Sequence, residues 1–369
     1  MYFSTLPTPS SSVPCILKRQ HLLKPTSNSA LSPQNPCTTQ INASPLQQHT
    51  YPASRKNSAL RVSFFCFMDM ALQYYNQPQI AVEEQIRLLK SEGLSFDNEC
   101  RAKHLLNNIS MFRLKSYLKP LRQQNSRRFK PGAKFEQAYT LYKFDSELRK
   151  MVCSELEKVE VSIRTQLSLT MGDDAGVFWF ADEANFRDAN RHASLLRNLQ
   201  EELHRSDDEA IMQFRRTYAN PFPPTWMTFE VSSFGTLSMM YRWLRAGHAR
   251  RHVANFYGVS DSVLESWLHS IVYVRNICAH HSRLWNRRLS INALVPRRTS
   301  LPFVTIPSDT KKVYYVLSII IYFLQTINPN NTFVTRFKSL LAKYPSVDVA
   351  AMGFPPGNWQ DEPLWNDQQ

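Results

Sequence analysis

The stretch FEQAYTLYKFDSELRKMVCSELEKVEVSIRTQLSLTMG, residues 135–172, decides the fold class. Its apolar residues recur at steps of three and four, at Leu141, Phe144, Leu148, Val152, Leu156, Val159, Ile163 and Leu167. In an α-helix this spacing aligns them along one face for about seven turns. Charged side chains occupy the opposite face. We therefore predict a long amphipathic helix that starts near Phe135 and ends at Gly172.

Helical spacing continues on both sides of this segment. We predict further helices at residues 81–91, 97–120, 188–205, 228–247, 251–257, 261–289 and 313–327. Asp97 and Asp261 are the expected N-caps of the second and sixth of these helices, and a turn follows residue 205. The chain has only 9 glycines, which argues against a Gly-rich phosphate-binding α/β enzyme and against a turn-dense β fold. We predict an all-α fold without internal repeats.

The 369-residue chain is basic, with a net charge of +14. Residues 1–69 hold six basic residues and one acidic residue and lack apolar periodicity, which is typical of disorder. Three interpretations of this extension stay open. Translation starts at Met68 or Met70, or the extension is a disordered arm that contacts nucleic acid, or it is a transit-like segment. We favour the first, and then plain disorder. The +9 on residues 70–369 predicts an anionic partner.

The cysteines and the apolar runs indicate a cytoplasmic protein. The chain has six cysteines, no two of them in CxxC spacing, so neither a zinc knuckle nor a disulfide framework is expected. The longest apolar run of the body, residues 313–327, is too short to span a membrane and reads as a buried helix. The first residues lack the pattern of a secretory signal peptide. We expect no membrane association, no cofactor and no metal.

The sequence RNICAHHSRLWN, residues 275–286, carries the candidate chemistry. If its helix continues to residue 289, one broad face presents Arg275, Asn276, His280, Arg283 and Arg287. Histidine transfers protons near neutral pH, and arginine neutralises charge on a phosphorane. The face has no carboxylate to hold Mg²⁺, so the pattern favours metal-independent cleavage of RNA. In the structural alternative, His280 and Asn276 satisfy each other and a backbone carbonyl at a helix end.

Two further charged features have alternative interpretations. The loop 122–134 exposes Arg127, Arg128 and Lys130, which either contact nucleic acid or belong to an ordinary solvated loop. Glu160 and Arg164 are four residues apart and form a favourable ion pair on a helix. From spacing alone, the solvated interpretation is preferred for both features.

Residues 275–286 resemble the RNxxAHHxRxWN signature of the Abi family of phage abortive-infection proteins, the AbiD/AbiF-like group of the HEPN superfamily. Further segments agree in order, at residues 77–94, 112–120, 142–152, 157–167, 223–241 and 352–365. The resemblance covers roughly residues 77–366. It excludes the N-terminal extension.

The resemblance implies a helical bundle whose Arg-x4–6-His motif forms a ribonuclease site. By motif, Arg275 and His280 are then catalytic and Asn276 supports them. His281, Arg283 and the Glu160–Arg164 pair also match positions typical of the family, and Arg287 adds charge for RNA binding. Such sites are usually shared across a dimer, so one motif per chain implies a homodimer.

The resemblance also implies a toxin that a regulatory RNA or an antitoxin protein controls. Two alternatives remain, a non-catalytic RNA-binding module and a protein-interaction scaffold. The expected organisation is an extension at 1–69, an N-terminal helical module at 70–134, a HEPN-like bundle at 135–345, and a C-terminal extension at 346–369 that packs on the bundle.

Overall fold

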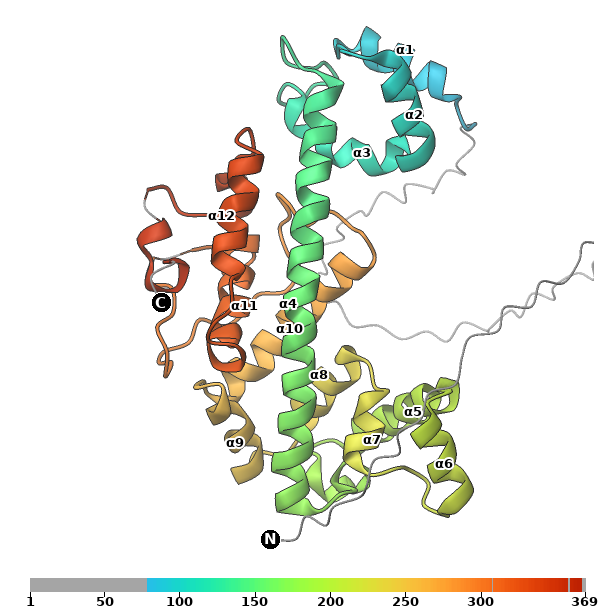
Figure 1. The fold of residues 1–369 in the computed structure, drawn as a ribbon, viewed down its shortest axis with the longest axis vertical. Coiled ribbons are helices and arrows are strands. Elements are labelled where there is room, and N and C mark those ends of the chain that lie inside the picture. The colour runs from blue at the N-terminus through green and yellow to red at the C-terminus, as the bar shows by residue number, and fades with distance from the viewer. Residues whose placement is uncertain (1–77, 307, 358, 367–369) are drawn as a thin grey trace, which may run out of the picture. The chain divides into compact units, whose positions relative to one another are not determined.

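The computed structural model describes residues 78–306, 308–357 and 359–366. These residues contain twelve α-helices and six short 3-10 helices and no β-strand, which confirms the all-α prediction (Figure 1). The expectations for residues 1–69 fall outside the described part of the chain. The described residues form one compact unit. Its division at residues 134 and 345 stays a prediction.

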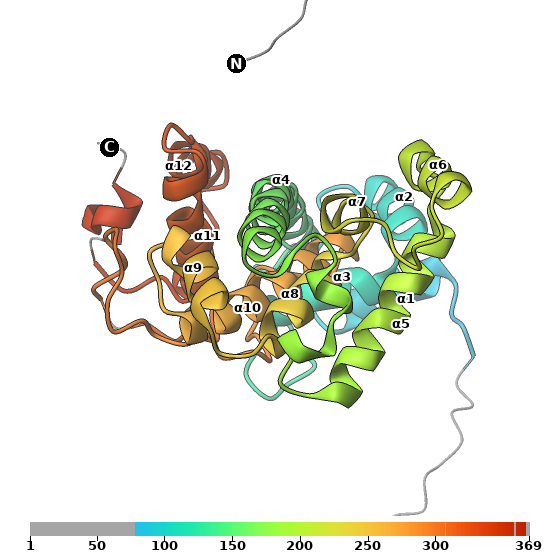
Figure 2. The same cartoon turned by 90° about the horizontal axis from the view of Figure 1, so that it is seen from below.

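Helix α4, Phe135–Ala175, is the predicted long helix and organises the core. All eight residues of the predicted apolar stripe are buried. Figures 1 and 2 show α4 between α11 and α12 on one side and α7 on the other, and α4 packs against all three. The helix ends at Ala175, before Gly176, which has a positive φ of 80°. The prediction that Gly172 ends it is wrong, because Gly172 lies inside the helix and the left-handed position falls four residues later.

In the described part of the chain, three α-helices precede α4, namely α1 (Val82–Ser91), α2 (Glu99–Ile109) and α3 (Met111–Leu118). The single helix predicted over 97–120 is broken at Ser110, whose φ of 66° is incompatible with a continuous right-handed helix. Asn98 caps α2 through its side-chain oxygen, 2.8 Å from the Arg101 amide. Asp97 instead pairs with Lys134 at 2.8 Å, so it is not the N-cap.

The middle of the chain forms α5 (Ala189–Arg205), α6 (Glu209–Thr217), α7 (Thr225–Glu230), α8 (Phe234–Trp243) and α9 (His248–Phe256). Helix α5 matches its prediction, whereas α6 replaces part of the region expected to be a turn. Asp208 caps α6 by accepting hydrogen bonds from the amides of Ala210 and Ile211. The helix predicted over 228–247 is split into α7 and α8, because Ser233 caps a new helix start.

The last helices are α10 (Asp261–Ala279), α11 (Val313–Ile327) and α12 (Phe333–Lys343). Ser260, and not Asp261, is the N-cap of α10. Helix α11 has the predicted bounds and is buried over most of its length. Among the described residues, no helix has the length and hydrophobicity needed to cross a bilayer. After α12 the chain packs back on α11, where the Trp365 indole donates to the Ser318 hydroxyl at 3.0 Å.

Candidate functional site

Helix α10 ends in the middle of the candidate motif. The amide of His281 donates to the Cys278 carbonyl at 3.0 Å, and the amide of Ser282 donates to the Ile277 carbonyl at 2.9 Å. This is the Schellman pattern, with His281 at the left-handed position where glycine is usual (φ 54°). The helix does not continue to residue 289. The predicted helical face that includes Arg283 and Arg287 is therefore wrong.

Arg275 lies one turn before this end and faces α4. Its guanidinium contacts the Glu160 carboxylate at 3.3 Å and the Asn276 side-chain oxygen at 3.3 Å. Glu160 also pairs with Arg164 at 3.1 Å. Arg164 is only 8% exposed and donates to the backbone carbonyls of Phe229 at 2.5 Å and Ser232 at 3.1 Å. The solvated interpretation of the Glu160–Arg164 pair is therefore wrong, because Arg164 ties the turn between α7 and α8 to α4.

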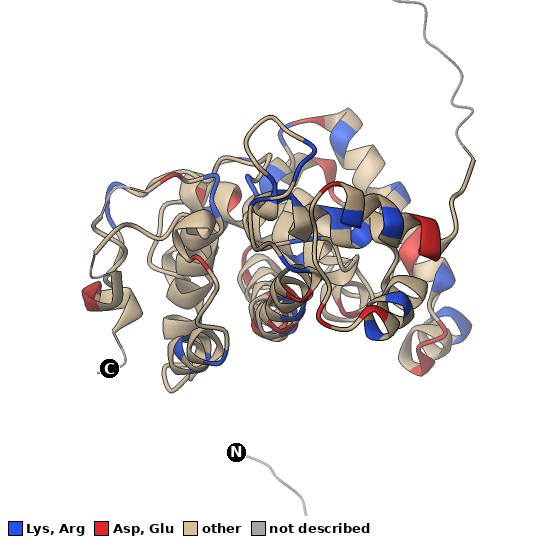
Figure 3. Cartoon of the chain, turned by 90° about the horizontal axis from the view of Figure 1, so that it is seen from above, with Lys and Arg blue, Asp and Glu red and all other residues tan. Residues whose placement is uncertain are grey.

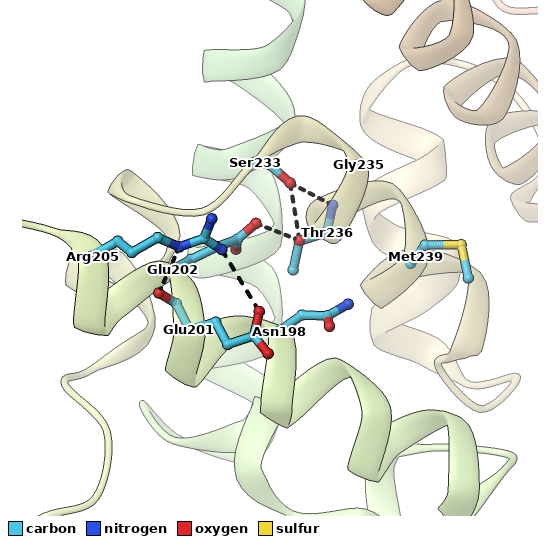
Figure 4. Close-up of a pocket in the computed structure, with 8 residues that line it drawn as sticks. All are labelled: Asn198, Glu201, Glu202, Arg205, Ser233, Gly235, Thr236 and Met239. Atoms are coloured by element: carbon cyan, nitrogen blue, oxygen red, sulfur yellow. Dashed lines mark hydrogen bonds and ion pairs between the residues drawn. The ribbon is translucent and has the colours of Figure 1, made fainter. Parts of the chain in front are cut away.

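The Arg275 side opens into a cavity of about 620 Å³, which we call the Arg275 pocket. Its lining is mixed in charge and comes from α4, α5, α10 and the turn between α7 and α8, namely Glu160, Arg164, Glu202, Arg205, Ser206, Glu230, Val231, Ser232, Ser233 and Arg275. The adjacent cavity in Figure 4 shares Glu202, Arg205 and Ser233. There the Thr236 hydroxyl of α8 donates to Glu202 of α5 at 2.9 Å. In the Arg275 pocket, the three glutamates offset the three arginines, so its lining has little net charge.

His280 opens into a different cavity of about 650 Å³, which we call the His280 pocket. Its lining joins α3 to the turn after α10 and consists of Ser110, Phe112, Arg113, Ser116, Tyr117, His280, His281, Ser282, Arg283, Arg287 and Arg288. Four arginines and two histidines line it, and no carboxylate of the described residues does. This is the charge pattern of a site for a polyanion.

The His280 side chain is exposed and makes no hydrogen bond with any described residue. Its backbone amide donates to the Asn276 carbonyl at 3.0 Å as part of the helix end. The Asn276 side-chain oxygen accepts from Arg275 instead. The structural alternative, in which His280 and Asn276 satisfy each other's side chains, is therefore wrong. The imidazole is free to meet a ligand.

Asp145 on α4, which is not among the predicted site residues, positions the loop after the histidines. Its carboxylate is completely buried and accepts from the amides of Leu284 at 3.2 Å and Trp285 at 2.6 Å. It also accepts from the Tyr117 hydroxyl at 2.5 Å and pairs with Arg149. One buried charge thus connects α3, α4 and the loop. The sequence contains one signal for this role. Asp145 lies next to Phe144 of the apolar stripe and four residues before Arg149, which is the spacing of a buried ion pair on a helix.

The structure does not bring the basic loop into either pocket. Arg127, Arg128 and Lys130 are exposed and line neither cavity. Arg122 of the same loop pairs with Glu92 at 2.8 Å and stacks over Phe129. Lysines and arginines are spread over many elements (Figure 3). In the described part of the chain, no three His, Cys, Asp or Glu side chains form a group that could hold a metal ion.

Part of the chain that carries this geometry resembles a known protein family. Residues 104–286 match a family described as Abi-like protein. This region is similar to the Abi-like family. This Abi-like region begins in α2 and ends just after the His-His turn, so it contains Asp145, Glu160, Arg275 and His280. No curated protein and no solved structure matches the chain.

Proposed function

We propose that this protein is a phage-defence protein of the AbiD/AbiF type that cleaves RNA as a metal-independent HEPN endoribonuclease. The Abi-like match supports the defence role. The unpaired His280 imidazole in a pocket of arginines and histidines supports the ribonuclease activity, and this single observation carries the proposal. The site of action is the cytoplasm.

In the proposed reaction, His280 moves a proton at the scissile phosphate. The 2′-hydroxyl loses its proton and its oxygen forms a bond to phosphorus, while the bond from phosphorus to the 5′-oxygen breaks and that oxygen gains a proton. The products are a 2′,3′-cyclic phosphate and a 5′-hydroxyl. His281, Arg283 and Arg287 hold the strand, and Arg275, which donates to the Asn276 side-chain oxygen, neutralises the negative charge of the transition state. Arg127, Arg128 and Lys130 lie outside the pocket and add charge along the RNA.

The proposed active form is a homodimer. Within one chain, Arg275 and His280 open into different pockets, and Glu160 engages Arg275. A site built from the Arg275 of one protomer and the His280 of its partner resolves this separation. Control of such a toxin requires an antitoxin protein or a regulatory RNA, as the family resemblance implies.

The deciding experiment is an RNA cleavage assay in EDTA with the full chain. We expect the wild type to release ends with 2′,3′-cyclic phosphates, and His280→Ala and Arg275→Ala to lose roughly 100-fold or more of the rate. His252→Ala is the matched control, because His252 is an exposed histidine of α9 outside both pockets. Cleavage that persists in His280→Ala, or that requires Mg²⁺, overturns the proposal.

A second candidate function is binding of RNA without cleavage. The observation that favours it is the Glu160 contact, which neutralises Arg275 within the chain. In this case His280→Ala binds RNA and inhibits growth like the wild type. The same two variants, expressed in growing cells, therefore distinguish the two functions.

A further inference from the structure

An aromatic side chain stands exposed at the edge of the His280 pocket. Phe112, in the first turn of α3, is 89% exposed, the highest value of any large hydrophobic side chain in the described part of the chain. Its neighbours in the pocket lining are Ser110, Arg113 and Ser116. Within the pocket lining these neighbours of the ring are polar or cationic, whereas the centre of a protein interface is more apolar than the rest of the surface. A ring that is bare to water and surrounded by polar and cationic groups suits a ligand with both a flat face and a negative charge.

The charge on the other side of the pocket is available to such a ligand. Arg283 is half-buried, and its guanidinium donates no hydrogen bond to any described residue. Burial lowers its pKa, which Tyr117 and Asp145 partly oppose. The guanidinium nevertheless keeps its charge at neutral pH. An unpaired, half-buried arginine gains stability when an anion replaces the water it has lost.

The contacts between the two sides fix the geometry of the pocket. Arg113 of α3 donates to the His281 carbonyl at 2.5 Å, so α3 is tied directly to the His-His turn. Arg287 donates to the Arg283 carbonyl at 3.2 Å, which closes the loop on itself. The aromatic ring of α3 and the arginine of the loop therefore belong to one connected pocket, although about 170 residues separate them in the sequence.

We propose that Phe112 and Arg283 form a nucleotide subsite in which one base of single-stranded RNA stacks on Phe112 and a neighbouring phosphate pairs with Arg283. This inference rests on the proposed RNA-directed function and adds a recognition residue from α3 to it. Aromatic stacking accepts every base, and duplex RNA hides the faces of its bases. The subsite therefore selects single strands.

The test measures RNA binding by fluorescence anisotropy, with the full chain carrying His280→Ala to prevent cleavage. In this background, Phe112→Ala weakens binding of a single-stranded oligonucleotide at least about fivefold, and Phe112→Trp restores it. An abasic strand of equal length and charge binds Phe112→Ala and its parent equally. Arg283→Ala makes the binding constant depend less steeply on salt concentration, by the contribution of about one phosphate contact. Phe112→Ala leaves this salt dependence unchanged. Phe256→Ala, which removes an exposed phenylalanine of α9, is the matched control.

Each other outcome overturns the inference. If Phe112→Ala and its His280→Ala parent bind the single-stranded oligonucleotide equally, and the wild-type chain cleaves RNA, the proposed subsite is wrong. The proposed function is then unaffected. Equal losses for the base-bearing and abasic strands rule out stacking. A loss that accompanies dissociation of the dimer in size-exclusion chromatography makes Phe112 an interface residue. A wild-type chain that binds and cleaves no RNA overturns both proposals together.

Discussion

At the scale of single residues, Asp145 connects α3 and the loop after α10, the two elements that line the His280 pocket. It is completely buried and holds two loop amides, one tyrosine hydroxyl and Arg149, which is itself buried. We expect Asp145→Asn to lower the free energy of unfolding by about 3–5 kcal/mol, because the buried Arg149 charge loses the carboxylate that it pairs with and stays desolvated. Urea unfolding of the full chain measures this loss.

The matched control for Asp145 is another carboxylate of α4. Glu147 pairs with Lys343 at 2.8 Å, and both side chains are substantially exposed to water. Glu147→Gln therefore costs less than about 1 kcal/mol. Equal losses for the two variants would show that Asp145 does not hold the loop in place.

The positions of Arg275 and His280 show which part of the site the sequence could not predict. Arg275 and His280 are five positions apart, which predicts a separation of about 140° on a helix but not the pocket that each one faces. The partner of Arg275 is Glu160 of α4, and the His280 pocket takes Phe112 and Arg113 from α3. Such contacts depend on the packing of distant helices. A local pattern cannot specify them.

At the scale of elements, long periodic helices are predictable and their ends are less so. Uninterrupted apolar spacing predicts helices α4 and α11. Burial of one face of α4 and of most of α11 stabilises these helices. The helix breaks at Ser110 and His281 place non-glycine residues at positive φ. Serine and histidine rarely adopt this conformation, so the sequence does not predict the two breaks. The end of α10 matters most, because it decides which side chains belong to the helix and which to the loop.

The folded end of α10 makes a chemical prediction. Cys278 is buried two residues before His280, and burial, with a smaller effect of Cys153, raises the pKa of its thiol to about 12. We expect iodoacetamide at mildly alkaline pH to modify exposed Cys100 in the native chain and to leave Cys278 unmodified, because the thiolate is the reactive form. Mass spectrometry of the peptides reads each site separately.

The same labelling in concentrated urea supplies the control, where both cysteines react. Modification of Cys278 at the rate of Cys100 in native buffer would mean that the last turn of α10 opens freely. The His280 pocket would then not be a preformed site.

At the scale of the whole molecule, the separation of the two motif residues leads to a test of assembly. Arg275 and His280 line different pockets of one chain. In a symmetric dimer with shared sites, each site takes the arginine of one protomer and the histidine of the other. We predict that mixing the inactive variants Arg275→Ala and His280→Ala restores cleavage. Random exchange of subunits makes half of the dimers mixed, each with one intact site, so the rate recovers to roughly a quarter of the wild type.

The outcome separates the two possible arrangements, since a site contained in one chain gains nothing from mixing. Subunit exchange is verified with differently tagged chains, so that an absence of recovery can be interpreted. Each variant mixed with itself remains inactive and sets the baseline. Exchange without recovery would place Arg275 and His280 in the same chain's site. In that case Arg275 has to leave Glu160 before it meets RNA, and Glu160→Gln, which weakens that contact, should then raise the cleavage rate.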